Sequence, residues 1–172
     1  MKKCKQCGLR FTPSRPLQFL CSVECAIPYT LDRKGKPVKL PRVKRELTRA
    51  DWLKKAQQVF NEYIRERDRG LPCISCQSVS AKQYHASHYR SVGAHPELRY
   101  CEFNVWSACQ KCNLHLSGNL IEYRRNLVKK IGQEKLDWLE GPHEPKKYTI
   151  EELQGIVKEY REKVKKIKAG GN

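Results

Sequence analysis

The chain has 172 residues and carries 35 lysines and arginines against 18 aspartates and glutamates, which gives a formal net charge of +17 at pH 7. This length suits one ordinary domain or two small ones. Only 39% of the residues are hydrophobic, so a large aliphatic core is not expected and another element must hold the fold together. So large a positive charge attracts polyanions, of which nucleic acid is the commonest in a cell, although solubility or a ribosome-like assembly role would fit it as well.

The sequence gives no sign of a membrane protein. No apolar run approaches the ~18–20 residues that a membrane span needs. The N-terminal sequence MKKCKQCGLR has no apolar stretch behind its lysines, so it lacks the pattern of a secretory signal. We therefore predict a protein of the reducing cytoplasm that makes no use of a membrane.

Nine cysteines form the clearest pattern in the chain. Disulfides and redox pairs are less expected in a reducing compartment than tetrahedral zinc, which suits thiolates spaced by two or three residues. We predict two structural Zn²⁺ sites with four cysteine ligands each, and Cys101 is left as a free, partly buried thiol. The ligands are the four close pairs Cys4/Cys7, Cys21/Cys25, Cys73/Cys76 and Cys109/Cys112.

The first two cysteine pairs lie in residues 1–30, with the spacing Cys-x₂-Cys-x₁₃-Cys-x₃-Cys. A segment this short cannot bury enough surface to fold unaided, so metal binding is expected to supply most of the stability of this N-terminal zinc module. Residues 31–48 follow with two prolines, a glycine and many basic residues. They are predicted to form an extended basic linker, which either contacts phosphates or acts as a solvated spacer.

The third part, residues 49–172, is predicted to form a domain of α-helices and short strands. Thr48 followed by Asp51 indicates a helix start, because the two side chains can cap each other's backbone. Apolar residues then recur at helical spacing as far as Ile64, and Gly70 offers a stop. This apolar stripe predicts core packing more than a binding face.

Strands and shorter helices are expected beyond this first helix. Turn residues and β-formers prevail up to residue 107, with strands predicted near 83–88 and 105–108. Helices are predicted from about Asn113, over about 120–131 and 134–139, and from a capping box at Thr149 and Glu152 to about Lys168. The apolar positions of the last helix mark it as a packing or dimerisation helix.

The last two cysteine pairs clamp the ends of a segment of about thirty residues that contains His85, His88 and Asn104. Asn113 directly follows the last thiolate. In the order strand, loop, strand, Cys-x₂-Cys turn and helix, the segment is predicted to fold as a zinc-stapled ββα finger within an α+β domain. Such a finger would turn Asn113 toward the strand that carries His88. There the imidazole can take a proton from water while a divalent cation neutralises charge on a phosphate.

At this point the sequence resembles a known group of enzymes. The order His88-x₁₅-Asn104-x₈-Asn113, with the last Asn behind a Cys-x₂-Cys pair, resembles the HNH (ββα-metal) endonuclease finger. The stretches DRGLPCISC, ASHYRS, LRYCEFNVW, CQKCNLHLSGN and YRRNLVKKIGQE resemble the phage NinG/Rap recombination endonucleases. The resemblance runs from about residue 50 to the last helix, and the N-terminal cysteine module also fits. It implies a phage-encoded, structure-specific nuclease that cuts branched DNA such as D-loops and Holliday junctions.

The resemblance also implies a role for each motif residue. His88 would be the general base that activates water. Asn104 would hydrogen-bond the backbone and hold the loop beside the base. Asn113 would bind the catalytic cation, for which Mg²⁺ or Mn²⁺ is expected because hard cations prefer oxygen ligands. Without the resemblance, His88 reads as a strand residue or an extra zinc ligand, and Asn104 as an ordinary turn residue.

The sequence departs from the family pattern at the metal site. Many HNH fingers carry an acid immediately before the base, where this chain has Ser87, and the related phage proteins carry an aspartate three residues before the base, where it has His85. The second ligand of the catalytic cation is therefore expected to be His85, a water held by Ser87, or His115. A site without a carboxylate would hold Mg²⁺ weakly and favour Mn²⁺.

Four arginines are candidate phosphate contacts, although each can also be a solvated surface charge: Arg90, Arg99, Arg124 and Arg125. Symmetric cutting of a junction would require a homodimer, and other recombination proteins are possible partners. Two alternatives remain open. A non-catalytic zinc-finger protein would bind DNA or RNA without cleaving it, and a zinc-stapled adaptor would bind a protein partner with little affinity for nucleic acid.

Overall fold

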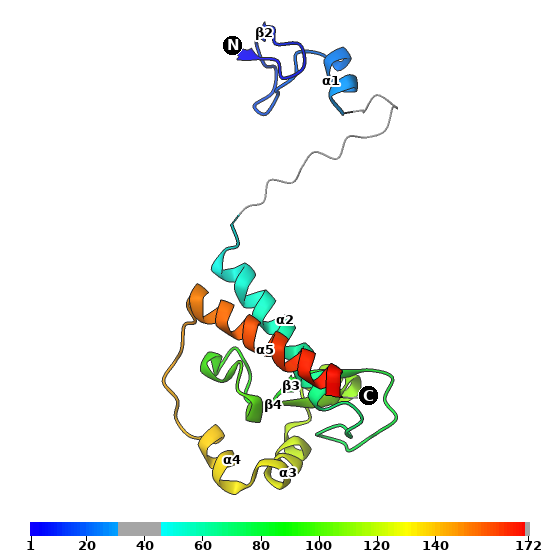
Figure 1. The fold of residues 1–172 in the computed structure, drawn as a ribbon, viewed down its shortest axis with the longest axis vertical. Helices are drawn as coiled ribbons and strands as arrows, with labels where there is room; N and C mark the ends of the chain where they lie inside the picture. Colours follow the sequence, from blue (N-terminus) through cyan, green and yellow to red (C-terminus); the bar gives the residue numbers. More distant parts are fainter. Residues whose placement is uncertain (31–45, 171–172) are drawn as a thin grey trace. The chain divides into compact units, whose positions relative to one another are not determined.

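The computed structural model describes residues 1–30 and 46–170, and it divides the chain into two compact units, Met1–Arg45 and Glu46–Asn172 (Figure 1). All but the last three residues of the predicted basic linker, 31–48, lie outside the described residues. Within the described residues, none of the helices combines the length and apolar character that crossing a membrane would require.

The N-terminal unit is built around its four cysteines. Strand β1 (Lys2–Lys3) pairs antiparallel with β2 (Arg10–Phe11), and helix α1 (Val23–Thr30) follows. The turn between the strands closes on the first cysteine pair, where Gly8 takes a left-handed φ of 76° and donates its N–H to the Cys4 carbonyl at 3.0 Å. No helix was predicted from the sequence in this module; α1 has only 8 residues and contains Pro28.

Helix α2 (Arg49–Arg67) begins with the predicted capping box. The Thr48 N–H donates to the Asp51 carboxylate at 2.9 Å, and the Asp51 N–H donates to the Thr48 hydroxyl at 3.3 Å. The chain leaves the helix through Gly70, whose φ of 79° suits a residue without a Cβ. The buried face is the apolar stripe read from the sequence, formed by Ala56, Val59, Phe60, Tyr63 and Ile64.

Helix α5 (Ile150–Gly170) begins with the second predicted capping box, at Thr149 and Glu152, and packs against α2. Its apolar stripe is buried within the unit, so packing inside the chain accounts for it. Together with residues of the loop and strands below, the two helices form the first core: Ala56, Val59, Phe60, Tyr63, Ile64, Tyr100, Val105, Tyr148, Leu153, Val157, Tyr160 and Val164.

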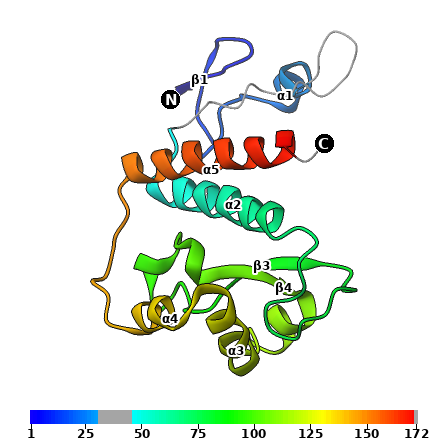
Figure 2. The same ribbon diagram turned by 60° about the horizontal axis from the view of Figure 1, so that its bottom comes forward.

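An antiparallel hairpin lies beneath this helix pair (Figure 2). Strand β3 (Tyr84–His88) pairs with β4 (Val105–Cys109), and His88 stands opposite Val105. Two short 3₁₀ turns, η1 (Pro96–Leu98) and η2 (Glu102–Asn104), shape the loop between the strands. The domain is thus a mixed α+β unit with a small sheet, and the strands lie where the sequence predicted them.

The other side of the hairpin faces helices α3 (Leu120–Ile131) and α4 (Gln133–Glu140) (Figure 2). They enclose a second core that includes three cysteines of the C-terminal group: Cys73, Ile74, Leu98, Ala108, Cys109, Cys112, Tyr123, Leu127, Leu136 and Leu139. Both cores are small, as the low hydrophobic fraction implied.

The helix expected from about Asn113 is only a short π-helical turn, whereas the separate helix predicted over about 120–131 is present. Asn113 lies in a single π-helical turn, η3 (Lys111–His115), and the regular helix begins only at Leu120. Three successive residues with positive φ separate the two, namely Ser117 (47°), Gly118 (91°) and Asn119 (49°). Left-handed backbone cannot continue a right-handed helix, so the chain is redirected at this point.

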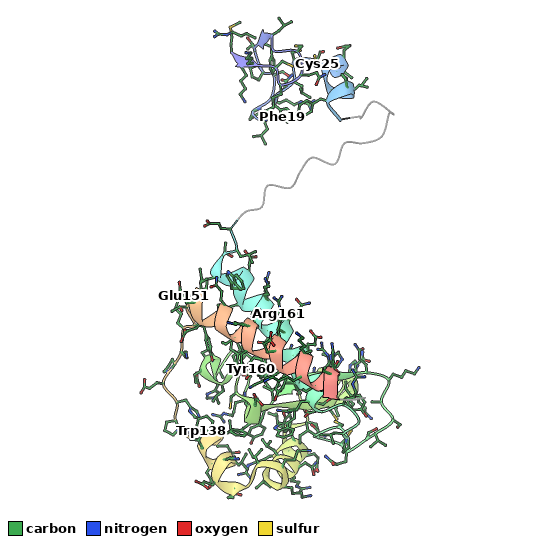
Figure 3. All side chains as sticks on the ribbon, viewed as in Figure 1. Phe19, Cys25, Trp138, Glu151, Tyr160 and Arg161 are labelled. Atoms are coloured by element: carbon green, nitrogen blue, oxygen red, sulfur yellow. The ribbon has the colours of Figure 1, made fainter. Side chains whose placement is uncertain are left out.

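Glu102 joins the loop before β4 to both helices of the first core. Its carboxylate accepts hydrogen bonds from Lys163 at 2.6 Å and from the hydroxyls of Tyr63 at 2.7 Å and Tyr160 at 3.3 Å. Tyr160 lies on α5 (Figure 3). Burial raises the pKa of Glu102, but the hydrogen bonds from Lys163 and Tyr63 outweigh it and bring the pKa below the ordinary value of 4.5.

Replacing Glu102 by Gln should lower the free energy of unfolding by about 1–2 kcal/mol at neutral pH, because hydrogen bonds to an ionised group are lost. A lowered folded-state pKa contributes stability above pH 4.5 that is lost as the pH falls through the folded value. The difference between wild type and E102Q, measured by urea denaturation, should therefore narrow from pH 7 toward about pH 4. Glu159→Gln removes the exposed second partner of Lys163 and should lower the free energy of unfolding by less. An equal loss of stability in the two variants would contradict the role given to Glu102.

Candidate functional site

The four C-terminal cysteines form a cluster suited to zinc. The sulfurs of Cys73, Cys76, Cys109 and Cys112 all lie within 4.8 Å of one another, and those of Cys76 and Cys109 are 3.7 Å apart. Tetrahedral Zn–S bonds of about 2.3 Å place sulfurs about 3.8 Å apart, so the geometry fits. Burial raises the pKa of Cys73, but N–H donors of Cys109 and Cys76 outweigh it and lower the pKa to about 7. Cys73 is thus the thiol of the cluster that is best prepared to bind as thiolate.

The N-terminal cluster has the same character. The sulfurs of Cys4, Cys7, Cys21 and Cys25 lie within 4.8 Å of one another. A hydrogen bond from the Cys7 backbone, opposed by burial, lowers the pKa of Cys4 to about 6. Cys101 belongs to neither cluster, and burial raises the pKa of its thiol. The two groups of four cysteines are those read from the sequence, and both can hold a metal ion.

His88 and Asn113 line the same cleft. This cleft, of about 270 Å³, lies where the end of β3 meets the η3 turn and the left-handed triplet. Its walls are Ala86, Ser87, His88, Ser91, Val92, Asn113, Ser117 and Gly118. Ser91, Ser117 and Gly118 were not singled out from the sequence, although the Ser-Gly-Asn run after the last cysteine pair is a turn signal that places the chain there.

The orientation of the His88 ring is set by one hydrogen bond. Its Nε2 lies 3.0 Å from the carbonyl oxygen of Arg99. A carbonyl can only accept, so Nε2 carries the proton and Nδ1 keeps its lone pair. Burial lowers the pKa of His88 from its ordinary value of 6.5 and the charge of Arg99 adds to this, while the bond to the carbonyl opposes both. The result is a neutral imidazole with one basic nitrogen.

Asn104 is fully buried and does not line the cleft. Its Oδ1 accepts from the Arg90 N–H at 2.7 Å, and its Nδ2 donates to the carbonyls of Arg90 at 3.0 Å and Leu98 at 3.1 Å. These bonds tie both ends of the loop between the strands. Because the loop also presents the Arg99 carbonyl, Asn104 acts on His88 only through the backbone.

The cleft offers oxygen ligands without charge. Asn113 follows Cys112 in the η3 turn, and the Gly118 N–H closes this turn on the Cys112 carbonyl at 2.8 Å. The other polar side chains of the cleft besides His88 are serines, and none of the residues that line it is acidic. Neutral oxygen ligands suit a hard cation that keeps several of its waters, at the cost of affinity.

The structure brings neither of the two other histidines to this cleft. His85 precedes His88 by three residues in β3, so the pleat turns the two side chains to opposite faces. Its Nε2 is buried without a hydrogen-bond partner among the described residues. His115 is exposed, and neither residue is part of the cleft wall.

The four candidate arginines fall into two classes. Arg124 forms a bidentate pair with Glu140, at 2.8 and 3.0 Å, and Arg125 pairs with Glu122 at 2.9 Å. A phosphate would have to compete with these carboxylates. Arg90 and Arg99 have no acidic partner among the described residues, and both lie in the loop beside His88. They are the better placed cations for an anionic ligand.

Comparison with known proteins assigns the family. The family model described as Bacteriophage Lambda NinG protein matches residues 30–170. The chain belongs to the NinG family. It is 39% identical over 190 residues to Protein ninG of Escherichia phage lambda, covering 97% of this chain and 93% of the relative. The NinG protein of Salmonella phage P22 is 37% identical over 190 residues, covering 97% and 94%. No solved structure matches the chain. These names state no activity, so function is inferred from the site.

Replacing Cys112 by Ser should remove one of two bound zinc ions per chain and unfold the region around α3, because a Cys₄ zinc site supplies much of the local folding energy. Zinc content by atomic absorption and helix content by circular dichroism test this. Cys101→Ser is the matched control and should keep two zinc ions and the fold. Full zinc content and folding in C112S would overturn the assignment of the C-terminal cluster.

Replacing Asn104 by Ala should lower the free energy of unfolding by about 2–4 kcal/mol, because one N–H and two carbonyls lose their partner inside the protein. Chemical denaturation of the zinc-loaded protein measures the effect. Asn113→Ala removes the same amide from a half-buried position in the cleft and should be nearly neutral for stability. Equal stability of the two variants would show that the buried amide does not hold the loop.

Proposed function

We propose that this NinG-family protein is a metal-dependent endonuclease of the HNH type that cuts branched DNA such as D-loops and Holliday junctions. One observation carries the proposal. A neutral imidazole whose Nδ1 is free, because Nε2 is held by the Arg99 carbonyl, shares a cleft with the amide of Asn113. The order of β3, β4, the cysteine turn and α3 supports the proposal, because a zinc-stapled ββα finger would have the same order.

The chemistry follows from these groups. The Nδ1 atom of His88 takes a proton from a water molecule, and the water oxygen bonds to phosphorus in line with the scissile bond. The bond from phosphorus to the 3′ oxygen breaks, the leaving oxygen takes a proton from solvent, and the products are a 5′-phosphate and a 3′-hydroxyl. A divalent cation held by Asn113 would neutralise charge on the phosphate.

The neutral ligands of the cleft are suited to Mn²⁺ as well as to Mg²⁺. Ser87 stands where many HNH fingers have an acid, and its hydroxyl can hold a water but adds no charge. A cation bound by neutral ligands depends more on the phosphate of the substrate for its own charge balance. We therefore expect weak cation binding in the absence of DNA and better activity with Mn²⁺ than with Mg²⁺.

The basic composition supports DNA as the substrate, and Arg90 and Arg99, which have no acidic partner among the described residues, would contact its phosphates. Symmetric incision of a junction requires two active sites, so a homodimer is part of the proposal. The second candidate function is a zinc-dependent DNA- or RNA-binding protein without catalysis. The uncharged cleft favours it, since no acidic residue lines the cleft wall.

Replacing His88 by Ala should slow nicking of a synthetic Holliday junction by about 10²–10⁴-fold, because the general base is lost. Gel assays with Mg²⁺ or Mn²⁺ measure the rate. The control is His143→Ala, because His143 stacks on Trp138 outside the cleft, and it should leave the rate unchanged. Asn113→Asp should lower the cation concentration that gives half-maximal rate, since a carboxylate binds more tightly.

Two results would overturn the proposed nuclease function. An unchanged nicking rate in folded H88A would rule out His88 as the general base. A wild-type protein that binds junctions but cuts none with any divalent cation would support the non-catalytic binding function instead.

A further inference from the structure

The exposed side of α2 carries a stripe of polar residues. Lys54, Gln57, Gln58 and Asn61 follow one another at the spacing i, i+3, i+4 and i+7, so they share a face opposite the buried apolar stripe. Together with Leu53 and Arg99 they line a shallow groove of about 440 Å³. We refer to these six residues as the α2 groove. Two of them are cations and none is acidic.

The amides of the α2 groove are already ordered. The Arg99 guanidinium donates to Gln57 Oε1 at 3.4 Å, and Gln57 Nε2 donates to Asn61 Oδ1 at 2.7 Å. Both amide oxygens are therefore used as acceptors inside the protein. Gln57 and Asn61 therefore offer mainly N–H donors, beside the cations of Lys54 and Arg99. A surface rich in donors and cations fits a ligand that offers only acceptors.

Phosphate oxygens are such a ligand, whereas a base edge in the major groove of DNA usually pairs an acceptor with a donor. An amide that reads adenine needs its own oxygen free to accept. The amide oxygens of Gln57 and Asn61 are occupied, so these side chains suit the backbone of DNA better than its bases.

Arg99 connects the α2 groove to the cleft. Its carbonyl oxygen accepts the hydrogen bond from His88, while its guanidinium reaches Gln57 on α2. A strand held in the groove would therefore be separated from His88 by Arg99 alone. No acidic residue lines the groove or the cleft, so neither surface repels phosphates.

We propose that the α2 groove binds the sugar-phosphate backbone of the DNA arm adjacent to the scissile phosphate, with Lys54 and Arg99 paired to phosphates and the amides donating to their oxygens. The proposal rests on the nuclease function stated above and adds where the arm is held. It makes the contact independent of base sequence, as recognition of a branch requires.

Replacing Lys54 by Ala should weaken binding of a fluorescent synthetic junction and reduce the slope of log affinity against log salt by about one, because one phosphate contact is lost. Fluorescence anisotropy without divalent cation measures both quantities. Lys55→Ala is the matched control, since Lys55 is the next residue of the same helix but lies over the Trp52 ring and outside the groove. Its salt slope should stay close to that of wild type.

Gln57→Glu keeps the side-chain size and places a negative charge in the groove. It should raise KM for nicking several-fold while kcat changes little, because the contact is equal in ground and transition states. Exchanging the sequence of the DNA arm should leave these effects unchanged. Equal slopes of log affinity against log salt in wild type, K54A and K55A would overturn the proposed role of the α2 groove, even if wild type cuts junctions. If wild type cuts no junction, a smaller slope in K54A would still establish the groove as a DNA contact, and only the proposed nuclease function would be overturned.

Discussion

The tetrathiolate cluster of the C-terminal unit is the constraint on which its other features depend. It joins two cysteine pairs that stand at opposite ends of the hairpin segment, and three of the four sulfurs are buried among the side chains of the second core. A chain with so few hydrophobic residues has little else to keep β3 and the η3 turn together. Because Asn113 directly follows Cys112 of this cluster, a metal bound there would also set where its amide stands relative to the strand that carries His88.

A second device, built on side-chain hydrogen bonds to backbone groups, completes the site. Asn104 holds the two ends of the loop between the strands, the loop presents the Arg99 carbonyl, and this carbonyl selects one tautomer of His88. None of these contacts involves a charged side chain, so the arrangement keeps the cleft free of fixed negative charge. The same loop carries the Arg99 guanidinium to α2, and the surface that we assign to DNA therefore shares its support with the imidazole.

Much of the fold could be read from local signals. Cysteine spacing identified both clusters, and each capping box marked the start of a helix because its two residues act within a single turn. The π-helical form of η3 was not foreseen, although the separate helix over about 120–131 was. The Ser-Gly-Asn run between them is a turn signal, and the closure of the turn on Cys112 accompanies the positive φ there. The polar face of α2 was also missed, since the order of its amides depends on a contact between Gln57 and Arg99, which is distant in sequence.

The single hydrogen bond at Nε2 of His88 also limits how the ring exchanges protons. While the Arg99 carbonyl occupies that nitrogen, Nδ1 is the one atom through which the imidazole can gain or lose a proton. In the proposed mechanism, a proton taken up by Nδ1 would leave through the opening that the cut strand vacates. Recovery of the neutral ring would thereby be coupled to departure of the product, and a product that dissociates slowly would delay both.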